Sequence, residues 1–569
     1  MARGSGRSSS RASGDTAVPE SGLPHEAGTR ADAVTLGDTG LTVHAERDEA
    51  GGPDELLPGW GGTMRDGLGV RAERGGVEIA ITGGLVLDPV LGVRRTSIGV
   101  VGGRITAIGR AGNPDTMDGI DVVLDSGTAV VDAGGLVVTP GVVDSHVHFL
   151  SPQVGATALA GGVTTLMVQD PSPVWNLGSG PASLLQTTYA AFQDVPLNVL
   201  MLIRGSAARP EVVEDGLRAG GGGLKIHEDV AAGPEQLRCA VDVCDRFDVQ
   251  LAIHTDGLNE AIGVAGTRAA IAGRPVHLFH IEGCGGGHAP NLLELAADAN
   301  MLCSSTNPTV PFGVHAEAEH LAMVSAVHLL DPGHRGGDWR ILRERVRAST
   351  MAAEGVLHDL GVIPMTSSDS QGMGRIGEIL RRMLQNAALM KRRFGGEAGG
   401  SDNERVLRHI AKATVNPAIT HGIAEHVGSL QVGRLADCAL WQPALCGVRP
   451  ELVLKAGVPA WGASGDGNAT TLLSEPVRVG PQLGALGAAP DRLSLAFVCE
   501  AGLDADLPTA RERAVVRGCR DIGAADMVRN TRRGAIAVDP RTGAVTLDGE
   551  PVTAPPADEV PLSTRYLLG

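Results

Sequence analysis

Aromatic residues, strongly basic segments and long hydrophobic runs are all scarce in this chain. Only 2% of its 569 residues are Phe, Trp or Tyr, so we expect hydrophobic cores built from Val, Leu, Ile and Ala. The formal net charge is −17 and no long basic run occurs, which argues against a nucleic-acid partner. No apolar run is long enough to cross a bilayer, so we expect no association with a membrane.

The eight cysteines are scattered and form no Cys-x-x-Cys pair. In so long a chain this distribution does not indicate a disulfide framework or a thiolate metal site. A reducing cytoplasm is therefore the simplest location. Residues 1–33 are polar and rich in Gly, Ser and Arg, without the apolar core of a secretory signal. We predict a disordered tail there.

Two different patterns of apolar and turn-forming residues follow this tail. Residues 34–138 contain short strand-like runs broken by Gly-Gly pairs, which is typical of antiparallel β-structure, and a similar style returns within 426–569. Residues 139–425 instead alternate apolar runs with helical segments. There are eight such runs, and the first, LVVTPGVVDSHVH (136–148), begins just before residue 139. Such alternation indicates parallel βαβ units.

The expected fold class is α/β, with a (β/α)8 TIM-type barrel over 139–425. A β-sandwich-like domain would be built from the N- and C-terminal segments, and the C-terminal segment would also supply closing strands and helices. An open doubly wound sheet is the alternative, although no Gly-x-Gly-x-x-Gly motif lies between a strand and a helix to support dinucleotide binding.

Polar residues end five of the expected barrel strands. A lone His-x-His pair such as His146 and His148 is more often a pair of core histidines than a ligand site. Here four other strands also end in polar residues, which are Lys225, His227, His254, His280 and Asp369. Asp369 alone has the simpler role of a helix cap. Burying these imidazoles and a lysine without a common role, however, would cost several kcal/mol.

A shared metal centre would explain why these polar residues lie together at the strand ends. Imidazoles and a carboxylate are standard ligands of divalent first-row metals, although they suit nickel, zinc and iron alike. A lysine ammonium cannot bind a metal, but a neutral amine that adds carbon dioxide becomes a carboxylate able to bridge two ions. Two metal ions about 3.5–4 Å apart can activate a water and polarise a carbonyl together.

Several long segments are also similar to those of a known family. GLKIHED (223–229), HTDGLNEA (254–261), HIEGCGGGHAPN (280–291) and SSDSQGMGRIGE (367–378) closely resemble the α (catalytic) subunit of urease, a dinickel member of the amidohydrolase superfamily. The similarity runs from about Val34 to the C-terminus. It implies that urea and water yield ammonia and carbamate, and that the carbamate decays to carbon dioxide and a second ammonia.

The resemblance also implies roles for the polar residues. One nickel ion would be held by His146, His148 and Asp369. The other would be held by His254 and His280. Lys225 would bridge the two ions as N6-carboxylysine, with carbon dioxide as the source of the carbamate.

Further residues would act on the substrate. His227 would bind the urea carbonyl oxygen. His328, on an active-site flap expected at about 312–345, would protonate the leaving ammonia, and Asp229 and Arg345 would tune that histidine. The resemblance further implies urease β and γ subunits as separate chains and nickel-insertion accessory proteins.

The chain departs from the family pattern at two places. The family's Cys-His-His flap triplet is here Val327-His328-Leu329, and the loop after the second barrel strand, within VQDPSPVWNLGSGPAS (168–183), is shorter and carries Trp175. These departures leave two alternatives open. One is a related binuclear-metal amidohydrolase acting on another amide or a cyclic amide. The other is a catalytically weak or silent paralogue that serves as an assembly subunit.

Overall fold

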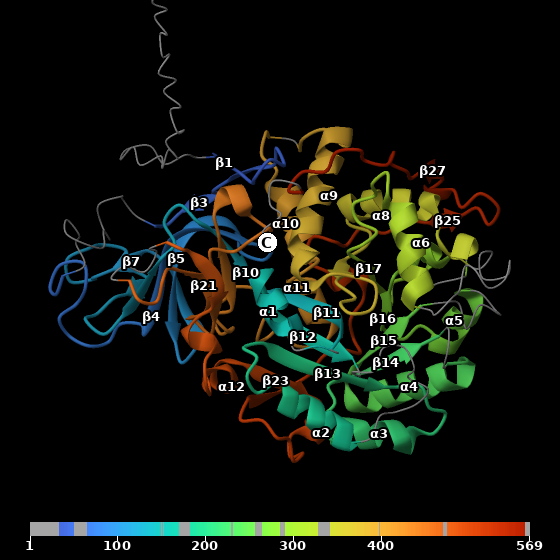
Figure 1. Cartoon of the computed structure of the whole chain (residues 1–569), viewed down its shortest axis with the longest axis horizontal. Helices are drawn as coiled ribbons and strands as arrows, with labels where there is room; N and C mark the ends of the chain where they lie inside the picture. Colours follow the sequence, from blue (N-terminus) through green and yellow to red (C-terminus); the bar gives the residue numbers. More distant parts are fainter. Residues whose placement is uncertain are drawn as a thin grey trace, which may run out of the picture. The chain divides into compact units, whose positions relative to one another are not determined.

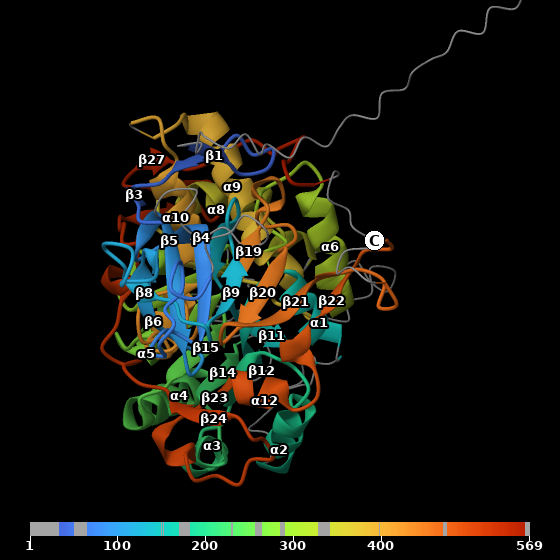
Figure 2. The same ribbon diagram turned by 90° about the vertical axis from the view of Figure 1, so that its left-hand side faces the viewer.

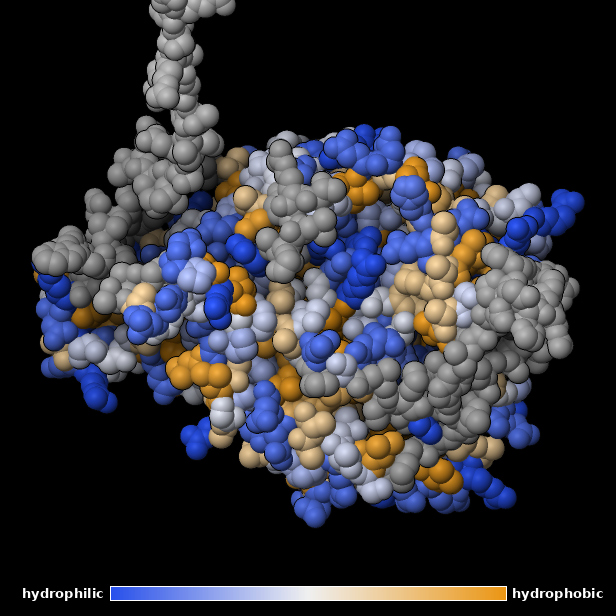
Figure 3. Space-filling model, in the orientation of Figure 1, coloured by the Kyte–Doolittle hydropathy of each residue, from blue (hydrophilic) through white to orange (hydrophobic). Residues whose placement is uncertain are grey.

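Two large β-sheets organise the described part of the chain. The computed structural model describes residues 33–50, 65–149, 151, 153–169, 182–228, 232–255, 264–284, 289, 291–327, 342–397, 399–469 and 475–563. On the face shown in Figure 3, hydrophobic residues form small patches among hydrophilic ones. Among the described residues, no helix combines the length and the apolar character needed to cross a membrane.

The first sheet joins strands from both ends of the sequence. Its main path is β22 (Arg478–Pro481), β21 (Val458–Ser464), β20 (Leu452–Lys455), β19 (Cys438–Trp441), β10 (Val137–Pro140), β4 (Ile79–Asp88), β5 (Gly92–Val101) and β3 (Arg47–Asp48). β6 (Arg104–Gly109) pairs with β5, and β9 (Ala129–Asp132) pairs with β4. Figure 2 shows the N-terminal strands, in blue, beside the C-terminal ones, in orange. The expected β-rich domain from two distant segments is thereby confirmed.

The second sheet is the barrel. Its eight parallel strands are, in order, β11 (Val142–His148), β12 (Val163–Gln169), β13 (Asn198–Arg204), β14 (Gly223–His227), β15 (Gln250–His254), β16 (Val276–Phe279), β17 (Met301–Thr306) and β18 (Met365–Ser367). The His148 amide donates to the Ser370 carbonyl at 3.0 Å, which joins β11 to the segment after β18. The sheet therefore closes on itself, so the (β/α)8 prediction is confirmed and the open-sheet alternative is wrong.

Helices cover the outside of the barrel, as Figure 1 shows for α2 to α5. The helices are α1 (Gln153–Ala160), α2 (Ala182–Ala191), α3 (Pro210–Arg218), α4 (Pro234–Phe247), α5 (Val264–Ile271), α6 (Ala316–Val327), α8 (Ala348–Asp359), α9 (Ile379–Phe394), α10 (Asn403–Ala411), α11 (Val415–Thr420) and α12 (Ala489–Leu493). Short 3-10 turns are η1 (Leu292–Ala297), η2 (Ile376–Glu378), η3 (Pro443–Leu445), η4 (Leu483–Ala485), η5 (Glu500–Gly502) and η6 (Ala524–Asp526).

Helix α4 illustrates how the sequence builds this outer layer. It begins at Pro234, where the missing amide hydrogen costs nothing. Its buried residues include Leu237, Ala240, Val241 and Cys244, whose spacing of three and four residues forms one apolar stripe. That stripe belongs to the hydrophobic cluster shared with the barrel strands. The barrel strands themselves are buried on both faces and therefore contain long apolar runs.

Smaller strands complete the fold. β23 (Leu495–Val498) pairs with β13 and with β24 (Glu512–Val515), both in parallel. The remaining strands are β1 (Ala33–Thr35), β2 (Thr42–His44), β7 (Ala111–Gly112), β8 (Val122–Val123), β25 (Ile536–Val538), β26 (Val545–Leu547) and β27 (Glu550–Pro551).

One expected strand proves to be two. The apolar run from residue 136 to 148 was expected to form a single barrel strand, but it divides between β10 in the first sheet and β11 in the barrel. The break falls at Pro140 and Gly141. A Cβ atom on Gly141 would lie 2.1 Å from Thr164 Oγ1, so only glycine fits where the chain passes between the sheets. Hydrophobicity alone does not reveal such a change of sheet.

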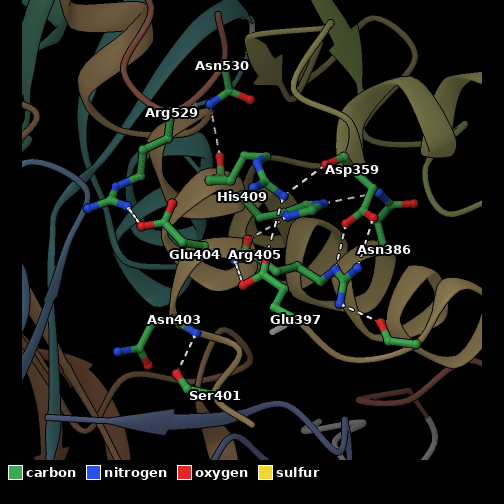
Figure 4. Close-up of polar contacts among 12 residues, drawn as sticks. Asp359, Asn386, Glu397, Ser401, Asn403, Glu404, Arg405, His409, Arg529 and Asn530 are labelled. Carbon is green, nitrogen blue, oxygen red and sulfur yellow. Dashed lines mark hydrogen bonds and ion pairs between the residues drawn. The ribbon is translucent and has the colours of Figure 1, made fainter. Parts of the chain in front are cut away.

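A buried polar network fixes helix α10 against α8 and α9 (Figure 4). The Arg405 guanidinium donates two hydrogen bonds to the Asp359 carboxylate, at 2.8 and 3.2 Å. His409 Nδ1 lies 2.8 Å from the Arg405 carbonyl oxygen, and its Nε2 lies 3.2 Å from Asn386 Nδ2. His409 therefore bonds through both ring nitrogens without carrying a charge.

Candidate metal centre

The barrel strands bring seven of the predicted polar residues to one end of the barrel. His146 and His148 are on β11, Lys225 and His227 are on β14, and His254 ends β15. His280 directly follows β16, and Asp369 lies two residues beyond β18. All seven are buried, with relative exposures of 1% to 6%. They lie at the carboxyl ends of the strands, where barrel enzymes carry their active sites.

The five histidines form a ring of neighbours. Their ring centroids are separated by 5.5 Å between His146 and His148, 6.4 Å between His148 and His227, and 4.8 Å between His227 and His254. The ring continues with 4.9 Å from His254 to His280 and 5.0 Å from His280 back to His146. The sequence placed these histidines at four strand ends, and the structure places them around one point.

The Asp369 carboxylate reaches three of these imidazoles. Its Oδ1 lies 3.2 Å from His146 Nε2 and 3.5 Å from His148 Nε2, and its Oδ2 lies 3.8 Å from His280 Nε2. The candidate ligand atoms of His146, His280 and Asp369 all lie within 4.8 Å of one another. This spacing allows one metal ion to contact several of them.

The protonation states suit metal binding. Burial, with Lys225 and the neighbouring histidines, holds the pKa of His146 well below its usual value. Burial also holds the pKa of His280 well below normal. Burial acts in the opposite direction on Asp369, but its hydrogen bond with His148 and the nearby His280 keep the pKa of its carboxyl lowered. Neutral imidazoles and an ionised carboxylate are the forms that bind metals.

The backbone is unusual at two of these residues. His280 has a φ of 48° and Asp369 a φ of 57°, in the left-handed region that non-glycine residues rarely adopt. The Asp369 carbonyl accepts hydrogen bonds from the amides of Gly372 at 3.1 Å and Gly374 at 2.9 Å. Backbone conformations of this kind persist where surrounding contacts impose them, and they are concentrated at functional sites.

Asp144 and Ser368 support the cluster, and the sequence reasoning missed both. Asp144 Oδ1 accepts hydrogen bonds from the His146 amide at 3.2 Å and the Ser368 amide at 3.0 Å. Ser368 Oγ donates to the His146 carbonyl at 3.2 Å. Burial raises the pKa of Asp144 to about 7. The available signal was a carboxylate two residues before His146, inside an otherwise apolar strand.

The structure describes only some of the remaining residues that the sequence analysis singled out. Asp229, His328 and Trp175 lie outside the described residues. Arg345 is buried. Val327 is the last residue of α6 and packs partly against a hydrophobic cluster that includes Val324.

The start of the expected flap is attached to the C-terminal part of the chain. The Val314 amide donates to the Ala557 carbonyl at 3.0 Å, and the Ala557 amide donates to the Phe312 carbonyl at 2.9 Å. This pairing fixes the residues that precede α6.

The donor set fits a divalent metal centre. Four buried imidazoles and a carboxylate are the ligand types that nickel, zinc and iron accept. His146 and His148 both direct Nε2 toward Asp369, and their Nδ1 atoms have no hydrogen-bond partner within the described part of the chain. Among the described residues these imidazoles are held only through their Nε2 contacts with Asp369, so they remain available as ligands.

Comparisons with known proteins agree along nearly the whole chain. A model of the amidohydrolase family matches residues 137–460, and a model of the urease alpha-subunit N-terminal domain matches residues 26–131. Urease subunit alpha 1 of Streptomyces avermitilis is 50% identical over 543 residues, which cover 94% of this chain and 97% of that protein. Urease subunit alpha 2 of Streptomyces coelicolor gives the same identity and coverage.

Solved structures include a D-hydantoinase from a Bacillus sp. AR9, with 15% identity and a TM-score of 0.49 over 71% of this chain and 97% of that one. The match to the two Streptomyces proteins extends through both the β-rich segments and the barrel. By that identity and coverage, this chain belongs to the urease alpha-subunit family, within the amidohydrolases.

Proposed function

We propose that this chain is the catalytic subunit of a urease, which hydrolyses urea to ammonia and carbamate. The carbamate then decays to carbon dioxide and a second ammonia. The observation that carries the proposal is 50% identity to curated urease alpha subunits over 94% of the chain. The buried cluster of histidines around Asp369 supplies the donor groups that this chemistry requires.

Two nickel ions would complete the site. One would be held by His146, His148 and Asp369. The other would be held by His254 and His280. Lys225, carbamylated by carbon dioxide, would bridge them. Bound nickel would supply Lewis-acid polarisation of the urea carbonyl and activation of a water.

The protein's own groups would orient urea and move protons. His227 would donate a hydrogen bond to the urea carbonyl oxygen, a role supported by its position between His148 and His254. Urea nitrogen is a poor leaving group, and it needs a proton as the C–N bond breaks. His328 would supply that proton, because imidazole titrates near neutral pH. Asp229 and Arg345 would tune the proton affinity of His328.

The active assembly would contain further chains. Urease β and γ subunits would bind this chain as separate polypeptides, and accessory proteins would insert nickel. The whole complex would operate in the cytoplasm. Membership of the urease alpha-subunit family supports the proposal of these partners.

The test is to purify the complex formed with its partner subunits and measure bound metal and ammonia release from urea. We expect about two nickel ions per chain and urea-dependent ammonia. A complex with two bound nickel ions that releases no ammonia from urea would contradict the proposal. Activity only with other amides, or only with zinc, would indicate a different amidohydrolase.

A second experiment addresses the bridging lysine. Lys225→Ala should abolish metal loading, because the bridging carboxylate is lost. Partial recovery of loading with a small added carboxylate such as formate would support the bridging role. Full loading of Lys225→Ala without any addition would contradict it.

A further inference from the structure

Phe279 lies directly against the metal cluster. It is the last residue of β16, immediately before His280, and it is fully buried. Its ring stacks on the His146 ring with centroids 3.8 Å apart and planes 12° apart. The Lys225 Nζ lies 4.0 Å from the centroid of the same ring. One of only seven phenylalanines in the chain therefore contacts two of the proposed metal ligands.

The Phe279 ring is itself fixed by neighbouring side chains. His277 lies two residues earlier on β16, on the same face of the strand. Its ring meets the Phe279 ring edge to face, with centroids 4.5 Å apart. His277 Nδ1 lies 2.9 Å from His421 Nε2, and its Nε2 lies 2.9 Å from Ser304 Oγ. These buried contacts hold Phe279 in one orientation.

The His146 ring requires such a support. A histidine ring rotates about χ2 with only broad preferences, and metal-binding histidines are normally oriented by a hydrogen bond from the second ring nitrogen. His146 Nδ1 is buried and has no hydrogen-bond partner among the residues that the structure describes. Its Nε2 nevertheless lies 3.2 Å from Asp369 Oδ1. The flat contact with Phe279 is the contact that sets the plane of this ring.

We infer that Phe279 is a positioning residue, which orients His146 and supports the end of Lys225 so that the site is arranged before metal enters. This inference rests on the proposed function. Aromatic stacking would here take the place of the hydrogen bond that usually orients a metal-binding histidine. A flat ring in parallel contact with the imidazole restricts its rotation about χ2, whereas a narrower aliphatic side chain does not.

The experiment compares Phe279→Leu with Phe497→Leu in the complex with its partner subunits. Phe497 is also fully buried on a strand of the barrel sheet, β23, so the two variants lose the same aromatic volume. The metal-free complexes are titrated with nickel in bicarbonate buffer, and binding is followed by calorimetry. Thermal unfolding of each metal-free complex is measured in parallel.

We expect similar decreases in unfolding temperature for the two variants. Only Phe279→Leu should weaken nickel binding. The expected loss of affinity is about 10- to 100-fold, as for other groups that orient metal ligands. Phe279→Met, whose flexible unbranched chain can fill the site without a flat face, should show the same weakening if Phe279→Leu does not fold. Nickel binding by Phe279→Leu or Phe279→Met within twofold of the wild type would overturn the inference, and so would equal weakening in Phe497→Leu. A wild-type complex that binds no nickel would overturn the proposed function, and this inference with it.

Discussion

The Asp369 amide donates a hydrogen bond to the His146 carbonyl at 2.9 Å, and the Asp369 carboxylate lies 3.2 Å from the Nε2 of the same histidine. The backbone contact closes the barrel between its first and last strands, and the side-chain contact belongs to the metal cluster. The distance between these two proposed ligands is therefore set by the closure of the barrel. Changes that move either backbone should alter metal binding.

Gly372→Ala should weaken metal binding. A Cβ atom at this position would lie 2.4 Å from Asp369 Oδ1 and 3.1 Å from His148 Cδ2, so the carboxylate must move. We expect nickel affinity to fall about 10- to 100-fold, as measured by calorimetric titration of the metal-free complex. Gly467→Ala is the control, because a Cβ atom there meets nothing within 4 Å. Unchanged nickel affinity in Gly372→Ala would show that metal binding does not depend on the present position of the Asp369 carboxylate.

His328→Ala should lower turnover and leave the metal content unchanged. The proposed role of His328 is to protonate the leaving nitrogen, and general acid catalysis typically contributes about 10²- to 10⁴-fold. The measurements are kcat for urea hydrolysis and nickel per chain by elemental analysis. Loss of nickel from this variant would mean that His328 has a structural or ligand role instead.

His409→Asn should make stability less sensitive to mild acid. Burial lowers the pKa of His409 to about 3, whereas the pKa of a histidine in the unfolded chain is about 6.5. Below pH 6.5 the unfolded chain therefore binds a proton that the folded protein excludes. The stability that neutral His409 contributes is complete above pH 6.5 and decreases as pH falls toward 3, by about 1.4 kcal/mol per pH unit.

The free energy of unfolding, measured in guanidinium at pH 6.5 and pH 5, should fall by about 2 kcal/mol less in His409→Asn than in the wild type. Asparagine retains an amide that can donate to the Arg405 carbonyl, which His409 Nδ1 contacts at 2.8 Å. Substitution of the exposed His315 by Asn is the control and should leave the pH dependence unchanged. An equal pH dependence of unfolding in wild type and His409→Asn would show that the pKa of His409 is not lowered by burial.

Lys455→Met should destabilise the fold strongly. Lys455 Nζ donates to the Asp437 carboxylate and to the Thr164 carbonyl at 3.2 Å, so it links β20 of the first sheet to β12 of the barrel. Both side chains of the ion pair are buried, at 0% and 3% exposure. Removing the cation leaves Asp437 buried without its counter-charge, which typically costs about 3–5 kcal/mol.

Guanidinium unfolding measures this loss. Arg375→Ala provides the comparison, because Arg375 and Glu319 form an ion pair with side chains 59% and 47% exposed. Such exposed pairs contribute about 0–1 kcal/mol. If Lys455→Met costs no more than Arg375→Ala, the buried pair does not stabilise the junction between the two sheets.

The barrel and most of its polar cluster were accessible from the sequence. Alternating apolar runs and helical segments predicted the parallel strands, and the residues at the run ends predicted His146, His148, Lys225, His254, His280 and Asp369 as neighbours. The reason is local: a strand of known direction places its last inward-facing residues at one end of a barrel. The exception was the run from residue 136 to 148, which changes sheet at Gly141 without a change in hydrophobicity.

The sequence by itself determined which chemical groups stand at the ends of the barrel strands, since periodicity and residue type are local properties. Only the tertiary structure decided how those groups are held. The contacts of Asp144 with Ser368, of Phe279 with His146, and of Lys455 with Thr164 join residues distant in the chain. Such contacts depend on how the sheet closes and packs, and no short-range pattern in the sequence records them.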